Sequence, residues 1–338
     1  MAPRLSVGLP VYNGEDYVGQ SIESLLGQTY DDFELIISDN ASTDATGEIC
    51  RSYASQDSRI RYVRQPRNIG LGPNHNFVFC ESRGELFKWA ACDDLYARDL
   101  LRRCVEALDA HPEVVLAHAW EAVIDESGTV TQALEYPLAT DSASAPQRFR
   151  SFLFGSSGLF DSPDGGMIRL DNRGILRSDD EYGVIRSDVL RQISPLGSYQ
   201  HSDMILICEL ALRGTFHITP EWLYFRREFP NRSFNTSPSV RGRSVILDPA
   251  RANRLRHSTA RLLGEYFWGY ISAIHRAPLS AADRRECYRQ IALWSVDRAA
   301  CRIVAKPVEP IDSLFSPLLN GREVSVRAAV AGQEELTR

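Results

Sequence analysis

The chain has 338 residues, 43% hydrophobic and 24% charged, which is the composition of a soluble globular protein with one large domain or two ordinary ones. Its 38 basic and 44 acidic residues give a net charge of −6, which argues against a general nucleic-acid-binding protein. No apolar run approaches the ~18 residues of a membrane span, and the N-terminus has no apolar secretory region. We therefore expect a cytoplasmic protein.

Short apolar runs alternate with helical patterns over the first 110 residues. Strands are predicted at Leu5–Leu9, Phe33–Ser38, Ile60–Val63 and Leu86–Ala91, and helices at 15–27, Ala45–Ser55, Gly70–Ser82 and Asp99–Ala110. Strands that alternate with helices are typical of an α/β fold, so we predict a doubly wound, mostly parallel, Rossmann-like sheet. The nearly all-apolar fourth run suits a strand covered on both faces.

The second half of the chain is less regular. A longer strand is predicted at Val114–Ile124, and residues 132–182 show only weak periodicity. Three further helices are predicted: Asp203–Arg213, one that begins at Asp248-Pro249 with an N-cap and a first-turn proline, and one from the capping box Ser280–Asp283 to about Val304. The last two form a C-terminal helical extension.

The extension has an unusual charge. Residues 248–306 contain eleven basic and five acidic residues, a net charge of +6, so the rest of the chain carries −12. An apolar stripe at helical spacing is predicted at Leu255, Thr259, Leu262, Tyr266, Tyr270 and Ile274. Such a stripe usually packs on a core. Two alternatives remain open: a homodimer seam, and a membrane-surface helix pair in which arginines attract anionic headgroups.

Polar and aromatic residues follow three of the predicted strands. The first strand leads into Pro10 and Tyr12, the second ends at Asp39, and the fourth leads into Asp93 and Asp94. Ligands of open α/β sheets bind beyond the carboxyl ends of the strands, so we expect these residues in one crevice. Clustered carboxylates raise one another's pKa unless a cation separates them, and a divalent metal held by carboxylates and substrate phosphates meets that need. The Tyr12 ring could stack on a nucleobase, and Asp39 could accept from a ring N–H.

The segments "SVGLPVYN", "SIESLLGQTYDDFELIISDNASTD", "NIGLGPNHN" and "GELFKWAACDDLY" resemble the family 2 glycosyltransferases of the GT-A fold. The resemblance covers about residues 5–125 and resumes at "GVIRSDVL" and "GSYQHSDMILICELALRG". It implies transfer of a sugar from a nucleoside diphosphate sugar to an acceptor, with inversion. UDP is the favoured nucleotide and dTDP the alternative.

The resemblance also implies roles for individual residues. Pro10, Tyr12 and Asp39 would hold the nucleoside, with Asp93 close to it. Asp93 and Asp94 match the DxD-type motif for Mn²⁺ or Mg²⁺, and Asp94 is the expected direct ligand.

Inversion needs a base that deprotonates the acceptor hydroxyl. The family places that base at a helix start, which implies Asp203, with His201 as an alternative. "WLYFRREFPNRSF" is similar to a loop rich in tyrosine and arginine, in which Arg226 and Arg227 would pair with the diphosphate. Glu228 and Phe229 stand where many members carry a histidine, so a metal contact from this loop is not expected.

These inferences give a division of the chain. We predict a GT-A catalytic domain at 1–235, with a nucleotide-binding half at about 1–125, an acceptor half at about 126–235 and an insertion at about 155–180. The helical extension follows at 236–306 and a tail at 307–338. The acceptor is unknown, and contact with the inner membrane face through 248–306 is an alternative to a wholly cytoplasmic location.

Three other functions compete with glycosyl transfer. A non-catalytic nucleotide-sugar-binding protein would keep Tyr12 and Asp39 without needing Asp203. A dinucleotide-dependent oxidoreductase finds only a weak signal in Gly70-Leu-Gly72, because His75 stands where its motif needs glycine. A nucleotidyltransferase would normally show a glycine-rich, lysine-containing phosphate loop near the first strand, and there is none.

Overall fold

The computed structural model describes residues 2–134, 140–155, 159–161, 167–169, 180–199, 201–230 and 240–304. The strands of its main sheet are β1 (Leu5–Val11), β2 (Phe33–Asp39), β3 (Ile60–Arg64), β4 (Leu86–Trp89), β5 (Leu95–Tyr96), β6 (Val114–Ile124), β7 (Val130–Leu134), β10 (Val184–Arg186) and β11 (Thr215–Arg227). The short strands β8 (Leu159–Asp161) and β9 (Met167–Arg169) pair with each other.

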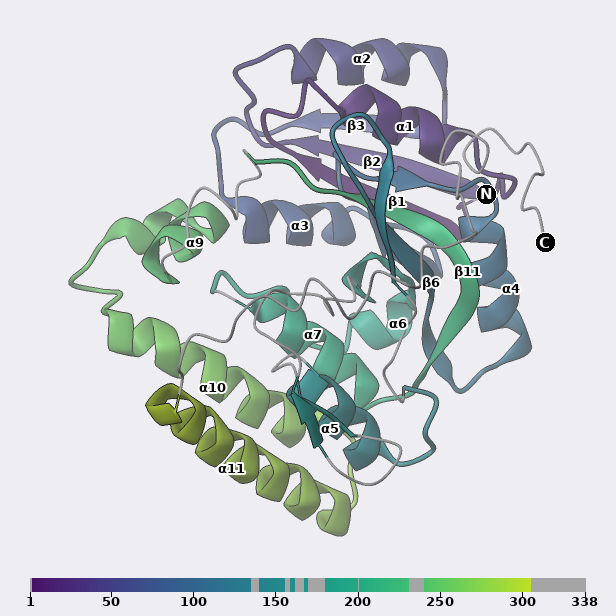
Figure 1. Ribbon diagram of the computed structural model, residues 1–338. Helices are drawn as coiled ribbons and strands as arrows, with labels where there is room; N and C mark the ends of the chain where they lie inside the picture. Colours follow the sequence, from purple (N-terminus) through teal and green to yellow (C-terminus); the bar gives the residue numbers. More distant parts are fainter. Residues whose placement is uncertain are drawn as a thin grey trace.

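The helices lie on both faces of this sheet (Figure 1). They are α1 (Val18–Leu26), α2 (Thr46–Gln56), α3 (Leu71–Cys80), α4 (Leu100–Ala110), α5 (Ala145–Gly155), α6 (Ser187–Leu190), α7 (Ser202–Ala211), α9 (Val240–Leu247), α10 (Thr259–Arg276) and α11 (Ala281–Val304), with short 3₁₀ helices η1 (Asp180–Tyr182) and η2 (Pro249–Ala252). The chain therefore has the predicted α/β fold with helices at its C-terminal end.

The strand order is β3-β2-β1-β4-β10-β6-β11-β5, with β7 paired to β6. The pairs β2–β3, β1–β2, β1–β4 and β6–β11 are parallel, which confirms the predicted mostly parallel sheet. Antiparallel pairs are also present: β10 at the centre runs antiparallel to both β4 and β6, β5 runs antiparallel to β11, and β7 to β6. The sequence did not reveal β10 because a strand of three residues is too short to show periodicity.

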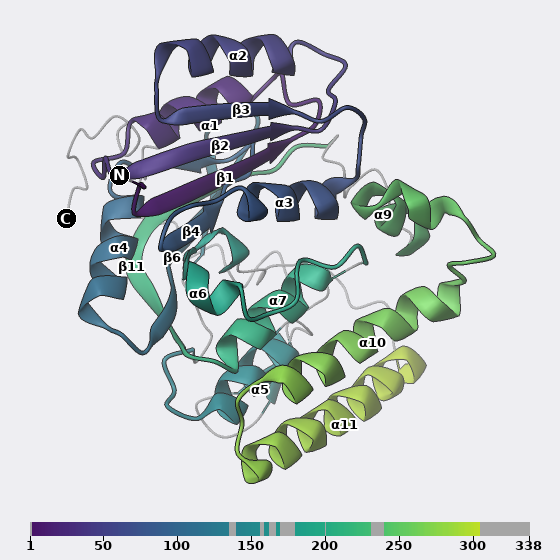
Figure 2. The ribbon, with the colours of Figure 1, turned by 180° about the vertical axis from the view of Figure 1, so that it is seen from behind.

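Side chains alternate between two cores, one on each face of the sheet. In β4, Leu86 belongs to the core covered by α1, α2 and α4, while its neighbour Phe87 belongs to the core under α3, α5, α6 and α7. This alternation follows from the two-residue period of a strand. It confirms that the fourth predicted strand is covered on both faces, and Figure 2 shows the second group of helices.

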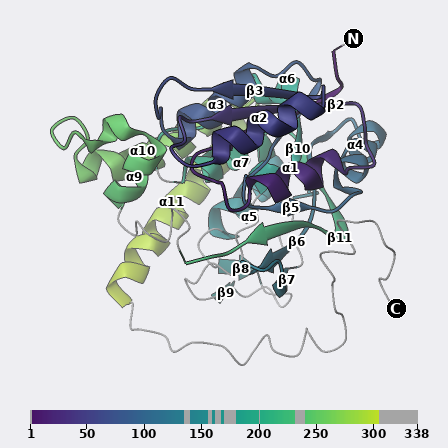
Figure 3. The same ribbon diagram turned by 90° about the horizontal axis from the view of Figure 1, so that it is seen from above.

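The C-terminal helices pack on the second face and extend it outward. Helix α10 contacts α7, and α11 contacts α5 and α10. Seen from above, α9, α10 and α11 gather at one end of the molecule, with α4 at the other (Figure 3). The rings of Tyr266, Tyr270 and Trp294 join the two long helices, with centroids 5.1–5.9 Å apart. Of the predicted stripe, Leu262, Tyr270 and Ile274 are buried, and Tyr266 packs against the second core.

One part of the predicted extension is wrong. Asp248 and Pro249 begin the 3₁₀ helix η2, in which the Asp248 carboxylate accepts from the backbone N–H of Ala250, and the long helix begins only after the Ser258 cap. Leu255 lies between the two and is 97% exposed. The local cap at Asp248 was sound, but the four residues that follow it close a single short turn.

Three predicted features of the chain lie wholly or mostly outside the described residues: the tail at 307–338, the domain boundary near 235, and most of the insertion at 155–180. Among the described residues, no helix is both long enough and apolar enough to cross a membrane. The homodimer and membrane-surface alternatives for 248–306 stay predictions.

The packing of the extension on the second core can be tested by truncation of one ring. Trp294 is 5% exposed between Tyr266 and Tyr270, whereas Val296 on the same helix is 68% exposed. We expect Trp294→Ala to lower the free energy of unfolding by about 3–5 kcal/mol. The matched Val296→Ala change is expected to alter it by less than about 0.5 kcal/mol. Chemical denaturation measures both, and equal effects would contradict the packing.

Candidate active site

The first three strands end side by side at one edge of the sheet. Val11 of β1 pairs with Asp39 of β2, and Asp39 pairs with Arg64 of β3. The loops that follow are tied together, because the N–H of Asn13 donates to the Ser42 hydroxyl over 3.0 Å. The left-handed backbone of Asn13, at φ 50°, makes this turn tight. The loops that follow β1 and β2, at Tyr12–Asn13 and Asn40–Ser42, thus form a rigid surface, which we call the shelf.

Pro10 and Tyr12 meet this shelf differently. Pro10 is buried within β1, opposite Ser38, so it shapes the strand end. Tyr12 follows β1 and is 46% exposed, which makes it one of the few large exposed hydrophobic side chains among the described residues. A ring held at the end of a parallel strand with a free face is suited to stack on a planar ligand.

Asp39 is held by a network of hydrogen bonds that the sequence did not reveal. Its carboxylate accepts from the backbone N–H of Ser42 at 2.7 Å, the Tyr62 hydroxyl at 2.8 Å and the Arg64 guanidinium at 2.6 Å. Burial by itself raises the pKa of Asp39, but the hydrogen bonds from Ser42 and Tyr62 and the charge of Arg64 outweigh it and hold the pKa below its usual value. Asp39 is thus ionised and fully buried, while the Arg64 side chain is 44% exposed above it.

Asp94 is an interior residue. Its side chain has no solvent exposure, accepts from the backbone N–H of Arg227 at 2.8 Å, and also accepts from the Tyr224 hydroxyl. Both partners belong to β11, so Asp94 connects the turn after β4 to the far side of the sheet. Asp93, one residue earlier, is partly exposed. Of the two carboxylates, Asp93 is therefore the one on the solvent side.

Arg227, at the end of β11, holds this turn in place. Its guanidinium is buried and donates to the backbone carbonyls of Asp93 (2.9 Å), Asp125 (3.0 Å) and Glu126 (2.9 Å), and to the side chain of Gln20 (3.0 Å). It also lies over the Tyr17 ring, 4.4 Å from the centroid. The side chain expected to contact a diphosphate thus already connects four segments of the chain: β11, the turn after β4, the turn after β6 and α1.

Arg226 points elsewhere. Its guanidinium forms ion pairs with Glu121, at 2.5 Å, and with Glu228. The predicted tyrosine- and arginine-rich loop is a strand up to Arg227, because β11 continues through it with β6 as partner. Alternation along that strand sends the two arginines in opposite directions.

Asp203 lies in the first turn of α7, two residues after His201, whose backbone is left-handed at φ 64°. Its charge acts on His75 of α3, where burial is the larger effect and lowers the histidine's pKa to about 4. Because α3 begins just after β3 ends, its first turns lie at the edge that also holds Asp39. The loop before α7 also contacts the first turn of α3, since a Cβ built on Gly72 would lie 3.5 Å from the carbonyl oxygen of Gly197, so Asp203 lies near the start of α3 on the second face of the sheet.

The fold has a recognisable class. The crystal structure of S. aureus TarS 1–349 superposes with a TM-score of 0.50 at 15% identity, covering 90% of this chain and 93% of that one. At this identity the likeness concerns the fold alone, and with the mixed sheet and strand-end carboxylates it defines the GT-A fold.

The sequence comparisons give the family. Residues 6–173 match the family described as Glycosyl transferase family 2, and the chain belongs to this family. It is 36% identical over 129 residues to the uncharacterized protein y4gI of Sinorhizobium fredii, 33% over 101 residues to the glycosyltransferase GlyG of Streptococcus pneumoniae, and 34% over 107 residues to GlyA of the same species. These matches cover 38%, 30% and 30% of this chain but only 14%, 34% and 15% of the three relatives.

The buried position of Asp94 gives a stability prediction. Asp94→Ala leaves the Tyr224 hydroxyl and the Arg227 N–H without their acceptor, which we expect to cost about 3 kcal/mol of unfolding free energy. Asp93→Ala, at the partly exposed neighbour, is expected to cost clearly less. Thermal and urea denaturation of the two variants compare them directly. A larger loss for Asp93→Ala would contradict the positions described here.

Proposed function

We propose that the chain is an inverting glycosyltransferase that moves a sugar from a nucleoside diphosphate sugar, UDP-linked by preference, to an acceptor hydroxyl. One observation carries the proposal. The exposed ring of Tyr12, the ionised carboxylate of Asp39 and the Asp93–Asp94 turn follow the paired strands β1, β2 and β4 at the same edge of the sheet. Family membership supports the reaction class. Because the chain spans only 14–34% of the length of the relatives named above, the activity, substrates and partners are all part of this proposal.

The nucleoside would lie on the shelf beyond β1 and β2. Tyr12 would stack on the base, with Pro10 fixing the strand end beneath it. Asp39 would accept from the base's ring N–H once Arg64 swings aside, or would act through Arg64, whose exposed N–H groups can donate to a base carbonyl. Uracil and thymine both offer these groups, so dTDP remains the alternative nucleotide.

A divalent cation, Mn²⁺ or Mg²⁺, fits this edge only together with its substrate. Among the described residues there is no group of three or more His, Cys, Asp or Glu side chains that could hold a metal ion. Such cations are commonly held by one or two carboxylates and completed by substrate phosphates. The sequence implied Asp94 as the direct ligand, but Asp94 is buried and accepts hydrogen bonds from Tyr224 and Arg227. Asp93 would therefore supply the carboxylate that reaches the ion, and Asp94 would hold the turn. A bound cation would neutralise charge on the departing diphosphate.

The chain's own residues would carry the proton transfer. Asp203 would accept the proton of the acceptor hydroxyl as its oxygen forms the bond to the anomeric carbon. The bond from that carbon to the diphosphate oxygen breaks in the same step, and its electron pair leaves with the nucleotide. Arg227 would act by fixing the Asp93 carbonyl. Arg226 would stabilise the end of β11 through its ion pairs with Glu121 and Glu228.

The oxidoreductase alternative finds less support. Gly70 does open helix α3 with a left-handed backbone at φ 93°. However, a Cβ built on Gly70 would lie 2.5 Å from the carbonyl oxygen of Leu247 and 2.9 Å from the Cα of Asp248. The end of α9 thus occupies the space at this glycine that a dinucleotide's pyrophosphate would need.

The first test concerns Asp93. Ligand binding to the folded state raises the melting temperature by mass action. We expect UDP to stabilise the chain, Mn²⁺ to increase that shift, and Asp93→Asn to remove the Mn²⁺-dependent part while UDP alone still binds. Thermal denaturation with UDP, in the presence and absence of Mn²⁺, measures all three. A full Mn²⁺ effect in the variant would contradict the assignment of Asp93.

The second test concerns Asp203. A positioned general base contributes about 10²–10⁴-fold to the rate. Asp203→Asn is expected to fold and to bind UDP as the unaltered chain does, and to lose turnover by that factor; His201→Asn is the matched control. Release of UDP from UDP-sugars, with candidate acceptors present, measures the rate. Normal turnover in Asp203→Asn, with loss in His201→Asn, would assign the base to the histidine instead.

A further inference from the structure

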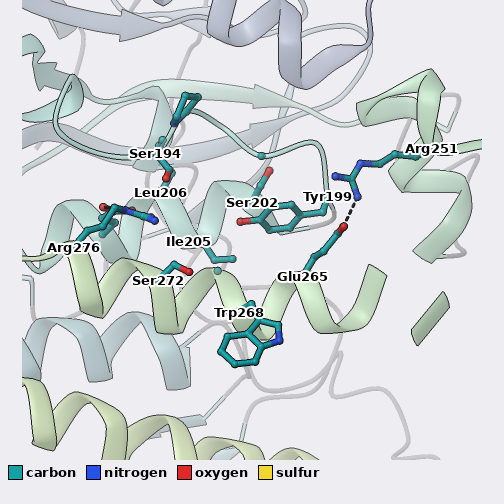
Figure 4. Close-up of a pocket in the computed structure, with 14 residues that line it drawn as sticks. Ser194, Tyr199, Ser202, Ile205, Leu206, Arg251, Glu265, Trp268, Ser272 and Arg276 are labelled. Atoms are coloured by element: carbon teal, nitrogen blue, oxygen red, sulfur yellow. Dashed lines mark hydrogen bonds and ion pairs between the residues drawn. The ribbon is translucent and has the colours of Figure 1, made fainter. Parts of the chain in front are cut away.

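A pocket of about 340 Å³ lies between α7, α10 and η2. Its walls are the loop before α7, the face of α7 that carries Ser202, Leu206 and Glu209, the 3₁₀ helix η2, and helix α10. Figure 4 shows Tyr199 in the middle of the pocket, with Arg251 and Glu265 at one end and Arg276 at the other. The volume lies within the ~300–1,000 Å³ of small-molecule sites.

The charges that line this pocket balance. Glu209 is 1% exposed and pairs with Arg276, with the guanidinium nitrogens 2.6 and 3.1 Å from its two carboxylate oxygens, and also with Arg213 at 3.2 Å, which is not part of the lining. Glu265 pairs with Arg251 at the other end and with Arg261, also outside the lining, at 3.1 Å. An anionic ligand would need surplus positive charge in the lining and a cationic ligand surplus negative charge. Each of the four charged side chains in the lining is already engaged in an ion pair, which favours a neutral ligand.

The remaining lining is both polar and apolar. The hydroxyls of Ser194, Ser202 and Ser272 belong to it, and so do Ile205 and Leu206. The Nε of Arg251 is buried with no hydrogen-bond partner among the described residues. Trp268, 63% exposed, belongs to the same lining. Apolar surface beside many donors and acceptors matches a pyranose, which has C–H faces and a rim of hydroxyls.

We propose that this pocket binds a neutral sugar unit of the acceptor, so that the acceptor is a carbohydrate of at least two units. The assignment rests on the proposed glycosyl transfer. Ser202 lines the pocket, and the next residue is Asp203. The lined face of α7 extends about 10 Å from Ser202 to Glu209. An acceptor whose reactive hydroxyl lies at Asp203 would therefore place a neighbouring sugar against α7 and α10.

The test uses the full chain and four neutral disaccharides: cellobiose, chitobiose, lactose and maltose. Saturation-transfer NMR detects binding, and titration gives each dissociation constant. Two variants alter the pocket: Trp268→Ala removes the exposed indole, and Ser272→Phe fills the space beside it. Phe267→Ala is the matched control, because Phe267 is an exposed aromatic residue adjacent to Trp268 that is absent from the lining. UDP binding is measured on every sample.

We expect at least one disaccharide to bind, with a dissociation constant raised about tenfold or more by Trp268→Ala and by Ser272→Phe. Phe267→Ala should leave it unchanged, and all variants should bind UDP equally. Absence of binding by all four disaccharides, or binding that neither pocket variant weakens, would overturn the proposal. Disaccharide binding by a chain that does not bind UDP would remove the acceptor role and the proposed function together, while the sugar pocket itself would stand.

Discussion

The buried guanidinium of Arg227 is the interaction on which the arrangement of the site depends. A charged group moved out of water is costly unless hydrogen bonds replace its hydration. Arg227 finds those bonds on the Asp93 carbonyl, on the turn after β6 and on α1, and it lies over Tyr17. Its backbone N–H holds Asp94. Burial lowers its pKa, yet a guanidinium remains charged. The cost of burying this charge is met only when all four segments are in place.

The burial of Arg227 gives the adjacent carboxylates Asp93 and Asp94 different surroundings. Asp94 faces inward to Tyr224 and Arg227, so the backbone between β4 and β5 is fixed. Asp93 can then face solvent from a rigid turn, as binding of a phosphate-bound cation requires. A similar division holds at β2, where Asp39 is ionised within the protein and Arg64 is exposed above it. In both places a buried acid holds an arginine of a neighbouring strand.

The sequence predicted the periodic elements well and the long-range contacts poorly. Strands β1, β2, β3 and β6 were visible because each contains a run of four or more residues that is rich in apolar side chains. The polar residues after β1, β2 and β4 marked the edge at which we propose that the ligand binds. No local pattern links Arg227 to Asp94, or Arg64 to Asp39, since the residues of these pairs are 133 and 25 positions apart in the sequence. Arginine is also too abundant in this chain for one to stand out. The exposed Leu255 shows the reverse error, a helical spacing extended across a short turn.

The central claim is that Asp93, fixed by Arg227, carries the cation and diphosphate of a nucleotide sugar. Crystals of the full chain grown with UDP and Mn²⁺ test it most directly, with diffraction recorded at the manganese absorption edge. The account predicts one anomalous peak between the Asp93 carboxylate and the UDP phosphates, with the base on Tyr12 and the Arg227 contacts unchanged. UDP bound away from Tyr12, or a manganese peak remote from Asp93, would contradict it.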